Sequence, residues 1–136
     1  MTVEIMEKAM KALASARLLL AADDTDGATN RAYYAMFDAA LAALSWAQGD
    51  TALRLAKTHS GLIASFGRHL VQAGHVPAEL GRSLNRLHEL RLTADYLAEP
   101  VPLDRARRAI EEAVSFVIGI RDLLTRTKPV GGAGSP

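Results

Sequence analysis

Apolar residues recur at three- and four-residue spacing along most of the chain, which is the pattern of amphipathic helices packed on a shared core. Polar, glycine- or proline-containing segments interrupt the pattern. It predicts helices over residues 3–21, 28–47, 55–72, 77–97 and 103–127. Because the connections are short, neighbouring helices are expected to run antiparallel. We therefore predict an all-α, antiparallel up-and-down bundle of four to five helices.

The helical pattern fits a single domain over residues 1–127. A chain of 136 residues with 49% hydrophobic content can bury roughly two thirds of its unfolded surface. Residues 128–136 are rich in glycine and proline, and we expect them to form a disordered tail.

Residues 28–47 form the least polar of the predicted helices. Arg31 and Asp38 interrupt it, two turns apart on one side, with Tyr34 at the edge of their face. A helix that is apolar or small nearly all round is either the centre of its domain or meets a second subunit. We expect a homodimer that forms through helix faces, with Arg31 and Asp38 paired within the chain or across the interface. The apolar residues of this helix form two stripes. We expect the first to belong to the core, and the second allows close contact with another helix; they are Tyr33, Phe37, Ala40 and Leu44, and Ala35, Ala39, Ala42 and Ala43.

The helix over residues 77–97 places an arginine in the middle of its apolar stripe. Arg91 falls among Leu80, Leu84, Leu87 and Ala98, with His88 one turn before it and Asp95 one turn after it. These three polar residues therefore project on one side of the helix. One interpretation is an intrahelical ion pair beside an exposed histidine. The other is a polar notch whose planar guanidinium holds a phosphate.

Composition and motifs exclude several classes of chemistry. The absence of cysteine rules out disulfides and thiolate metal sites. Inward Glu-x-x-His pairs, P-loops and serine elbows are all missing, so we predict no metal and no cofactor. The charged N-terminal segment is unlike a signal peptide, and no apolar run is long enough for a membrane span. We therefore expect a soluble, cytoplasmic protein without membrane contact.

Charge is unevenly distributed although the net charge is only +1. Residues 1–50 carry four Lys/Arg against seven Asp/Glu, whereas residues 51–110 carry nine against five. The basic middle could meet a polyanion such as RNA or a nucleotide. Ordinary solvated helix faces are the simpler explanation from charge alone.

Three segments together resemble the HEPN superfamily, in particular its small stand-alone prokaryotic members. They are Asn30–Ala40, Lys57–Gly61 and the stretch from Glu89 to Tyr96. The resemblance implies a dimerising helical bundle. It also implies a partner, because small HEPN proteins are often encoded beside a minimal nucleotidyltransferase as a toxin–antitoxin pair.

The nuclease branches of that superfamily carry an arginine followed after four to six residues by a histidine, and cleave RNA without metal. Arg91 matches the arginine, but its window holds Tyr96, Leu97 and Ala98 and no histidine. Metal-free cleavage needs groups that accept and donate a proton, and a tyrosine with a pKa of about 10 is a poor neutral-pH base. In some partnered toxins a nearby tyrosine accepts AMP from the nucleotidyltransferase, and Tyr96 is the nearest equivalent.

Three functions therefore stay open. The first is a binding module for RNA, a nucleotide or a partner protein; the second is a metal-independent endoribonuclease toxin that uses Arg91 and Asp95 with His88 or Tyr96; the third is a purely structural helical dimer. His59 is a further acid–base candidate for the nuclease. The residues expected to bind in the first case are Arg31, Tyr34, Asp38, Lys57, His59 and Tyr96.

Overall fold

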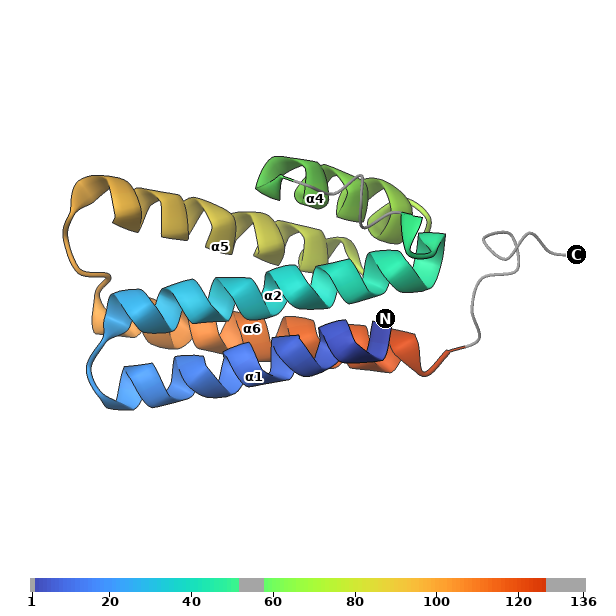
Figure 1. The fold of residues 1–136 in the computed structure, drawn as a ribbon. Coiled ribbons are helices and arrows are strands. Elements are labelled where there is room, and N and C mark those ends of the chain that lie inside the picture. Colours follow the sequence, from blue (N-terminus) through green and yellow to red (C-terminus); the bar gives the residue numbers. More distant parts are fainter. Residues whose placement is uncertain (1, 52–57, 127–136) are drawn as a thin grey trace, which may run out of the picture.

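The computed structural model describes residues 2–51 and 58–126, and these form five α-helices and one π-helical turn with no strand (Figure 1). The prediction of an all-α bundle is confirmed. The predicted tail, residues 128–136, lies outside the described residues. The elements are α1 (Thr2–Ala21), α2 (Thr25–Gln48), α4 (His59–Phe66), the π-helical turn η1 (Gly67–Val71), α5 (Ala78–Leu97) and α6 (Leu103–Leu124).

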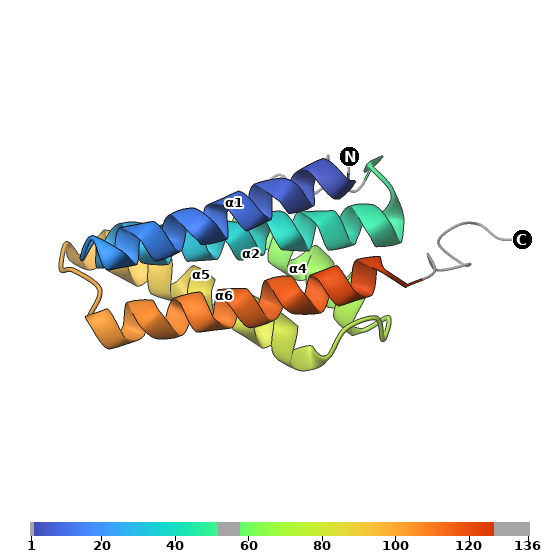
Figure 2. The same cartoon turned by 90° about the horizontal axis from the view of Figure 1, so that it is seen from below.

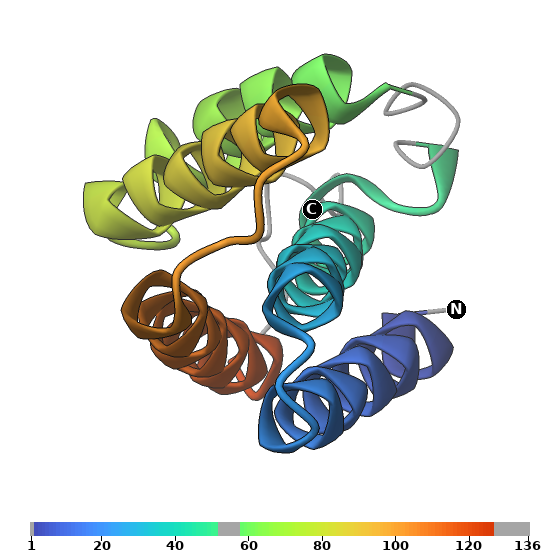
Figure 3. The same cartoon turned by 90° about the vertical axis from the view of Figure 1, so that its left-hand side faces the viewer.

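Helix α2 is the centre of the bundle, since it contacts α1, α4, η1, α5 and α6. Along the bundle axis, α4 and α5 lie on one side of α2 and α1 lies on the other (Figure 3). Helices α1, α2 and α6 run nearly side by side over most of their length (Figure 2). The apolar pattern of residues 28–47 predicted either the central helix of the domain or a helix that meets a second subunit. The structure shows that α2 is the central helix.

The buried side of α2 is built mainly from alanine, which lets α1 and α6 approach it closely. Tyr33, Met36 and Leu44 are the large side chains among these small ones, and all three are fully buried. One face of α2 is only half-buried. It consists of Asn30, Arg31, Tyr34, Phe37, Asp38 and Leu41, and we call it the open face of α2.

Local caps decide where the helices begin and end. The Asp24 side chain accepts a hydrogen bond from the Gly27 amide, so α2 begins at Thr25 and not at residue 28. Thr58 caps α4 in the same way through the Gly61 amide, and α4 therefore begins at His59. Of the predicted third helix, residues 55–57 lie outside the described part.

Two predicted details at the ends of the last helices are wrong. Ala98 has a φ of 56° and ends α5 in the left-handed conformation, so it is exposed and does not belong to the apolar stripe around Arg91. Helix α6 ends at Leu124 and not at residue 127. The Thr125 hydroxyl donates a hydrogen bond to the Asp122 carbonyl there, and so satisfies one of the carbonyl groups at the end of the helix.

None of the described helices is long and apolar enough to cross a membrane.

Candidate functional site

Rings and a guanidinium gather where α2, α4 and α5 meet. Helix α2 supplies three aromatic side chains, the first residue of α4 supplies a histidine, and α5 supplies a histidine and an arginine. We call this group the Arg91 cluster; its members are Tyr33, Tyr34, Phe37, His59, His88 and Arg91. Segments far apart in sequence meet here through the packing of α4 and α5 on α2.

Tyr33 lies at the bottom of the Arg91 cluster and is fully buried. Its ring centroid is 5.5 Å from that of His59 and 5.6 Å from that of His88. Tyr34 and Phe37 flank it on α2, with ring centroids 5.8 and 4.9 Å from that of His59. The aromatic side chains therefore surround His59 with apolar surface on the α2 side.

The two histidines of the cluster are stacked. Their ring centroids are 5.7 Å apart with an interplanar angle of 12°. Nδ1 of His59 is 2.7 Å from the Tyr33 hydroxyl oxygen, a hydrogen bond between residues 26 positions apart. His88 is 8% exposed, and its Nδ1 is buried without a hydrogen-bond partner among the described residues. One imidazole is thus anchored and the other carries an unsatisfied nitrogen.

The Arg91 guanidinium lies over two tyrosine rings, 5.2 Å from the Tyr33 centroid and 5.7 Å from the Tyr34 centroid. Its side chain is only 15% exposed. The predicted intrahelical pair with Asp95 exists, but its N–O distance is 3.3 Å and Asp95 is 64% exposed. The Nε atom of Arg91 is buried without a partner in the described part of the chain. This nearly buried cation therefore has an N–H group without an acceptor, and a bound anion can supply that acceptor.

Burial sets the protonation states in the cluster. It raises the pKa of Tyr33 to about 12, which outweighs the lowering by the Arg91 charge, so Tyr33 remains a neutral phenol near pH 7. Burial also lowers the pKa of His59. Arg91 and His88 lower it further, because their electrostatic effect disfavours the protonated form of the His59 ring. His59 is therefore a mainly neutral imidazole at neutral pH, able to exchange a proton or to donate a hydrogen bond.

Arg31 and Asp38 extend this chemistry along the open face of α2. The Arg31 guanidinium lies 5.8 Å from the Tyr34 ring centroid. Asp38 is half-buried, and burial raises its pKa while Lys8 and Arg31 pull the pKa down. No ion pair joins Arg31 and Asp38 within the described residues. The alternative, an ion pair between Arg31 of one subunit and Asp38 of another, stays a prediction.

Tyr96 is a predicted site residue that takes no part in the Arg91 cluster. Tyr96 is 91% exposed near the end of α5, and the described residues make no ring contact or hydrogen bond with it. Lys57 lies outside the described residues. Sequence reasoning also treated Tyr33 and Phe37 as core aromatics only. The contact of Tyr33 with His59 had no local signal, because a separation of 26 residues carries no helical period.

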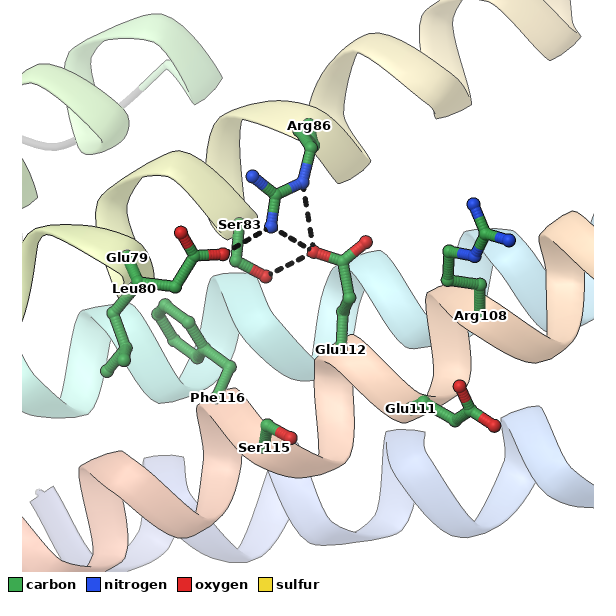
Figure 4. Close-up of a pocket in the computed structure, with 9 residues that line it drawn as sticks. All are labelled: Glu79, Leu80, Ser83, Arg86, Arg108, Glu111, Glu112, Ser115 and Phe116. Carbon is green, nitrogen blue, oxygen red and sulfur yellow. Dashed lines mark hydrogen bonds and ion pairs between the residues drawn. The ribbon is translucent and has the colours of Figure 1, made fainter.

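A second polar group lies on another side of α5, in a groove between α5 and α6 with a volume of about 430 Å³ (Figure 4). Arg86 donates to Glu79 at 2.6 Å and to Glu112 at 2.6 and 3.1 Å, and Ser83 donates to Glu112 at 2.8 Å. We call these four residues the Arg86 network. Nε and Nη2 of its arginine both bond to carboxylates, whereas Nε of Arg91 has no partner among the described residues.

Metal chemistry has no visible ligand set in the described part of the chain, where no three His, Asp or Glu residues are grouped to hold an ion. The donors of the Arg91 cluster are imidazoles, a guanidinium and a phenol. Guanidinium and imidazole N–H groups suit an anion, and neutral imidazole suits proton transfer.

Comparison with known proteins gives the same picture of the fold. The family model of the HEPN domain matches residues 2–127. A UPF0332 protein of Thermotoga maritima is 43% identical over 123 residues, 89% of each chain. Another UPF0332 protein, from Gloeobacter violaceus, is 40% identical over 94 residues, which are 68% of this chain and 70% of that one. A Methanocaldococcus jannaschii protein named "Putative toxin" is 32% identical over 120 residues, 88% of this chain and 86% of the other. A family match over nearly the whole chain, together with these relatives, shows that the protein belongs to the HEPN domain family.

Proposed function

We propose that the protein is a HEPN toxin-like protein that binds RNA through the Arg91 cluster. The observation that carries the proposal is Arg91 itself, which is nearly buried, holds one long bond to an exposed carboxylate, and keeps an unpartnered Nε. Burial removes water from such a charge, and the protein supplies too few hydrogen-bond acceptors to compensate for the lost solvation free energy. A phosphodiester matches the planar donor set of a guanidinium and supplies the missing acceptors.

Aromatic side chains beside the guanidinium favour a nucleic acid over a small anion. Tyr34 and Phe37 are half-buried on the open face of α2, and Arg31 lies against Tyr34. Unpaired bases stack on aromatic and guanidinium planes, so a phosphate at Arg91 with a base near Tyr34 is a compatible arrangement. The name of the M. jannaschii relative supports the toxin-like part of the proposal.

Metal-independent cleavage of the bound RNA is the second candidate, and the stacked pair His59–His88 beside Arg91 favours it. In that reaction a base takes the proton of a ribose 2′-hydroxyl, and the 2′-oxygen bonds to phosphorus. The bond from phosphorus to the 5′-oxygen then breaks, and an acid returns a proton to that oxygen. The two histidines supply titratable groups that the Arg91 window of the sequence lacks.

A minimal nucleotidyltransferase is the partner that the family resemblance implies, and Tyr96 is the residue we assign as its AMP acceptor. Tyr96 is 91% exposed and free of contacts in the described part of the chain, so a second enzyme can reach its hydroxyl. Co-expression with a candidate partner and intact-mass analysis tests this assignment. We expect the mass to rise by adenylate in wild type and to stay unchanged in Tyr96→Phe; the same gain in both would assign another acceptor.

A homodimer through the open face of α2 is the assembly we propose. The contact would use Phe37 and Leu41 of that face together with one residue of each charge, Arg31 and Asp38, while Tyr34 beside Arg91 lines the RNA site at its edge. A two-fold axis would let Arg31 of each copy meet Asp38 of the other. Light scattering on the purified protein should give twice the chain mass, and Asp38→Arg should shift the equilibrium towards monomer. A wild-type monomer would contradict the assembly.

The test of the function compares wild type with Arg91→Ala and Arg86→Ala, two arginines of the same helix. Metal-free proteins are titrated with labelled single-stranded RNA and incubated with total RNA in EDTA. We expect Arg91→Ala to lose binding and Arg86→Ala to bind like wild type. Fragments with cyclic phosphate ends that persist in EDTA and disappear in Arg91→Ala would support cleavage. If wild type does not bind RNA, the RNA function is wrong, and a structural dimer becomes the better explanation. If both variants bind as well as wild type, the Arg91 cluster is not the RNA-binding site.

A further inference from the structure

The hydrogen bond between Tyr33 and His59 has only one satisfactory direction. The Tyr33 hydroxyl oxygen is 2.7 Å from Nδ1 of His59, and the Tyr33 side chain is completely buried. Water therefore does not reach the phenolic hydrogen, and the described residues offer it no acceptor other than Nδ1. If Nδ1 carried the hydrogen instead, the phenol would be a buried donor without an acceptor, which is unfavourable.

We propose that Tyr33 is a positioning residue that donates its hydroxyl hydrogen to Nδ1 of His59 and so holds the neutral imidazole with its own hydrogen on Nε2. A neutral imidazole has one donor nitrogen and one acceptor nitrogen, and Tyr33 occupies the acceptor. His59 then presents an N–H donor to a bound phosphate, and near neutral pH its accepting nitrogen is already engaged by Tyr33.

This inference rests on the proposed RNA function and divides the roles within the cluster. His59 and Arg91 both donate to phosphate oxygens. His88, whose Nδ1 has no partner among the described residues, is the imidazole that remains to accept a proton. The stacked pair thus consists of one phosphate-binding histidine and one proton-accepting histidine, although the two residues look alike in sequence.

The surroundings of His59 agree with a neutral ring. Tyr33, Tyr34 and Phe37 face it from α2, and His88 and Arg91 face it from α5. No carboxylate among the described residues contacts His59 to stabilise an imidazolium. Burial raises the pKa of Tyr33 to about 12, so the phenol keeps the hydrogen that it donates.

Nitrogen-15 spectra of the histidine side chains test the assignment directly, without any need for activity. We use the full-length protein labelled on histidine and record long-range proton–nitrogen correlations above pH 7. In wild type we expect Nδ1 of His59 to resonate as an unprotonated nitrogen and Nε2 as a protonated one. Tyr33→Phe should produce a mixture of tautomers and raise the pKa of His59 by about one pH unit, because the neutral ring loses its donor.

Tyr34→Phe is the matched control, since its ring also contacts His59 but its hydroxyl has no hydrogen bond among the described residues. We expect this variant to keep the wild-type tautomer. A hydrogen on Nδ1 in wild type, or an unchanged tautomer in Tyr33→Phe, would overturn the assignment.

A 2′-deoxy oligonucleotide, which presents the phosphates and bases of RNA but cannot be cleaved through a 2′-oxygen, separates this inference from the function. Its addition should shift the Nε2–H signal of His59 in wild type. The expected tautomer without any response to the oligonucleotide would support the hydrogen-bond assignment and overturn the phosphate-binding role of His59. Loss of RNA binding in all proteins would instead count against the proposed function.

Discussion

Two arginines five residues apart on α5 have opposite surroundings. The Arg86 side chain is 48% exposed, yet it makes three close bonds to two carboxylates. The Arg91 side chain is 15% exposed, yet it makes one bond of 3.3 Å to an exposed aspartate. The charge that is easy to solvate is thus held by two carboxylates, and the charge that is hard to solvate has one long bond to a single carboxylate.

The difference separates a structural group from the group that we propose binds RNA. The Arg86 network links α5 to α6 across their groove, and Arg86 donates to Glu79 and Glu112 through Nε and Nη2. In the Arg91 cluster the polar atoms exceed the partners available, because Arg91 Nε and His88 Nδ1 are both buried and unpaired within the described residues. Unmatched buried donors and acceptors lower stability and mark a place where a ligand can be recognised.

The largest expected effect on stability comes from removing the buried Tyr33 ring from the Arg91 cluster. Tyr33→Ala leaves a cavity at a fully buried aromatic position and should lower the free energy of unfolding by about 3–5 kcal/mol. Tyr33→Phe keeps the volume and should lose only about 1 kcal/mol. Urea unfolding monitored by circular dichroism measures both. Equal losses in the two variants would show that the hydroxyl, and not the ring, supports the cluster.

Arg91→Met should weaken RNA binding about 10- to 100-fold, the effect of losing hydrogen bonds to a charged group. Its stability should stay equal or rise, because an apolar side chain of similar length replaces an under-paired and nearly buried cation. Fluorescence anisotropy and urea unfolding measure the two quantities. A variant that loses stability and keeps its affinity would make Arg91 a structural residue like Arg86.

Acid should affect the two regions in different pH ranges. Burial, Arg91 and His88 lower the pKa of His59 from 6.5, so its contribution to stability is complete above that value and is lost as pH falls below it. In the Arg86 network, hydrogen bonds from Arg86 and Arg82 lower the pKa of Glu79 from 4.5, and its contribution is lost only below that value.

Thermal unfolding as a function of pH separates the two contributions. His59→Gln should flatten the decline that starts near pH 6.5 and leave the decline below pH 4.5 in place. If His59→Gln and wild type have the same pH dependence between these values, His59 does not titrate as its surroundings predict.

The smallest effect is expected for Arg86→Ala, which removes a half-exposed cation. Its free energy of unfolding should fall by at most about 1 kcal/mol, and added salt should reduce the difference from wild type. RNA affinity should not change. A loss of affinity as large as that of Arg91→Met would place the α5–α6 groove on the RNA path and remove the contrast between the two arginines.

The sequence alone was sufficient for everything that depends on local spacing. Helical periodicity gave the all-α bundle, and the apolar pattern of residues 28–47 indicated a helix that becomes the central α2. The placement of His88, Arg91 and Asp95 on one side of α5 also follows from steps of three and four residues, which turn a helix by about one turn. The resemblance to HEPN proteins identified the family correctly.

Only the tertiary structure decided which side chains from different helices meet. His59 was one residue of a short motif until the packing of α4 placed it on Tyr33 and His88. Tyr96 lies in solvent because the end of α5 is largely exposed, with Asp95 and Leu97 exposed beside it. Contacts between distant helices depend on how whole apolar faces fit together, and this fit has no period that a sequence displays. The balance of paired and unpaired polar atoms, which distinguishes Arg91 from Arg86, exists only once those faces have packed.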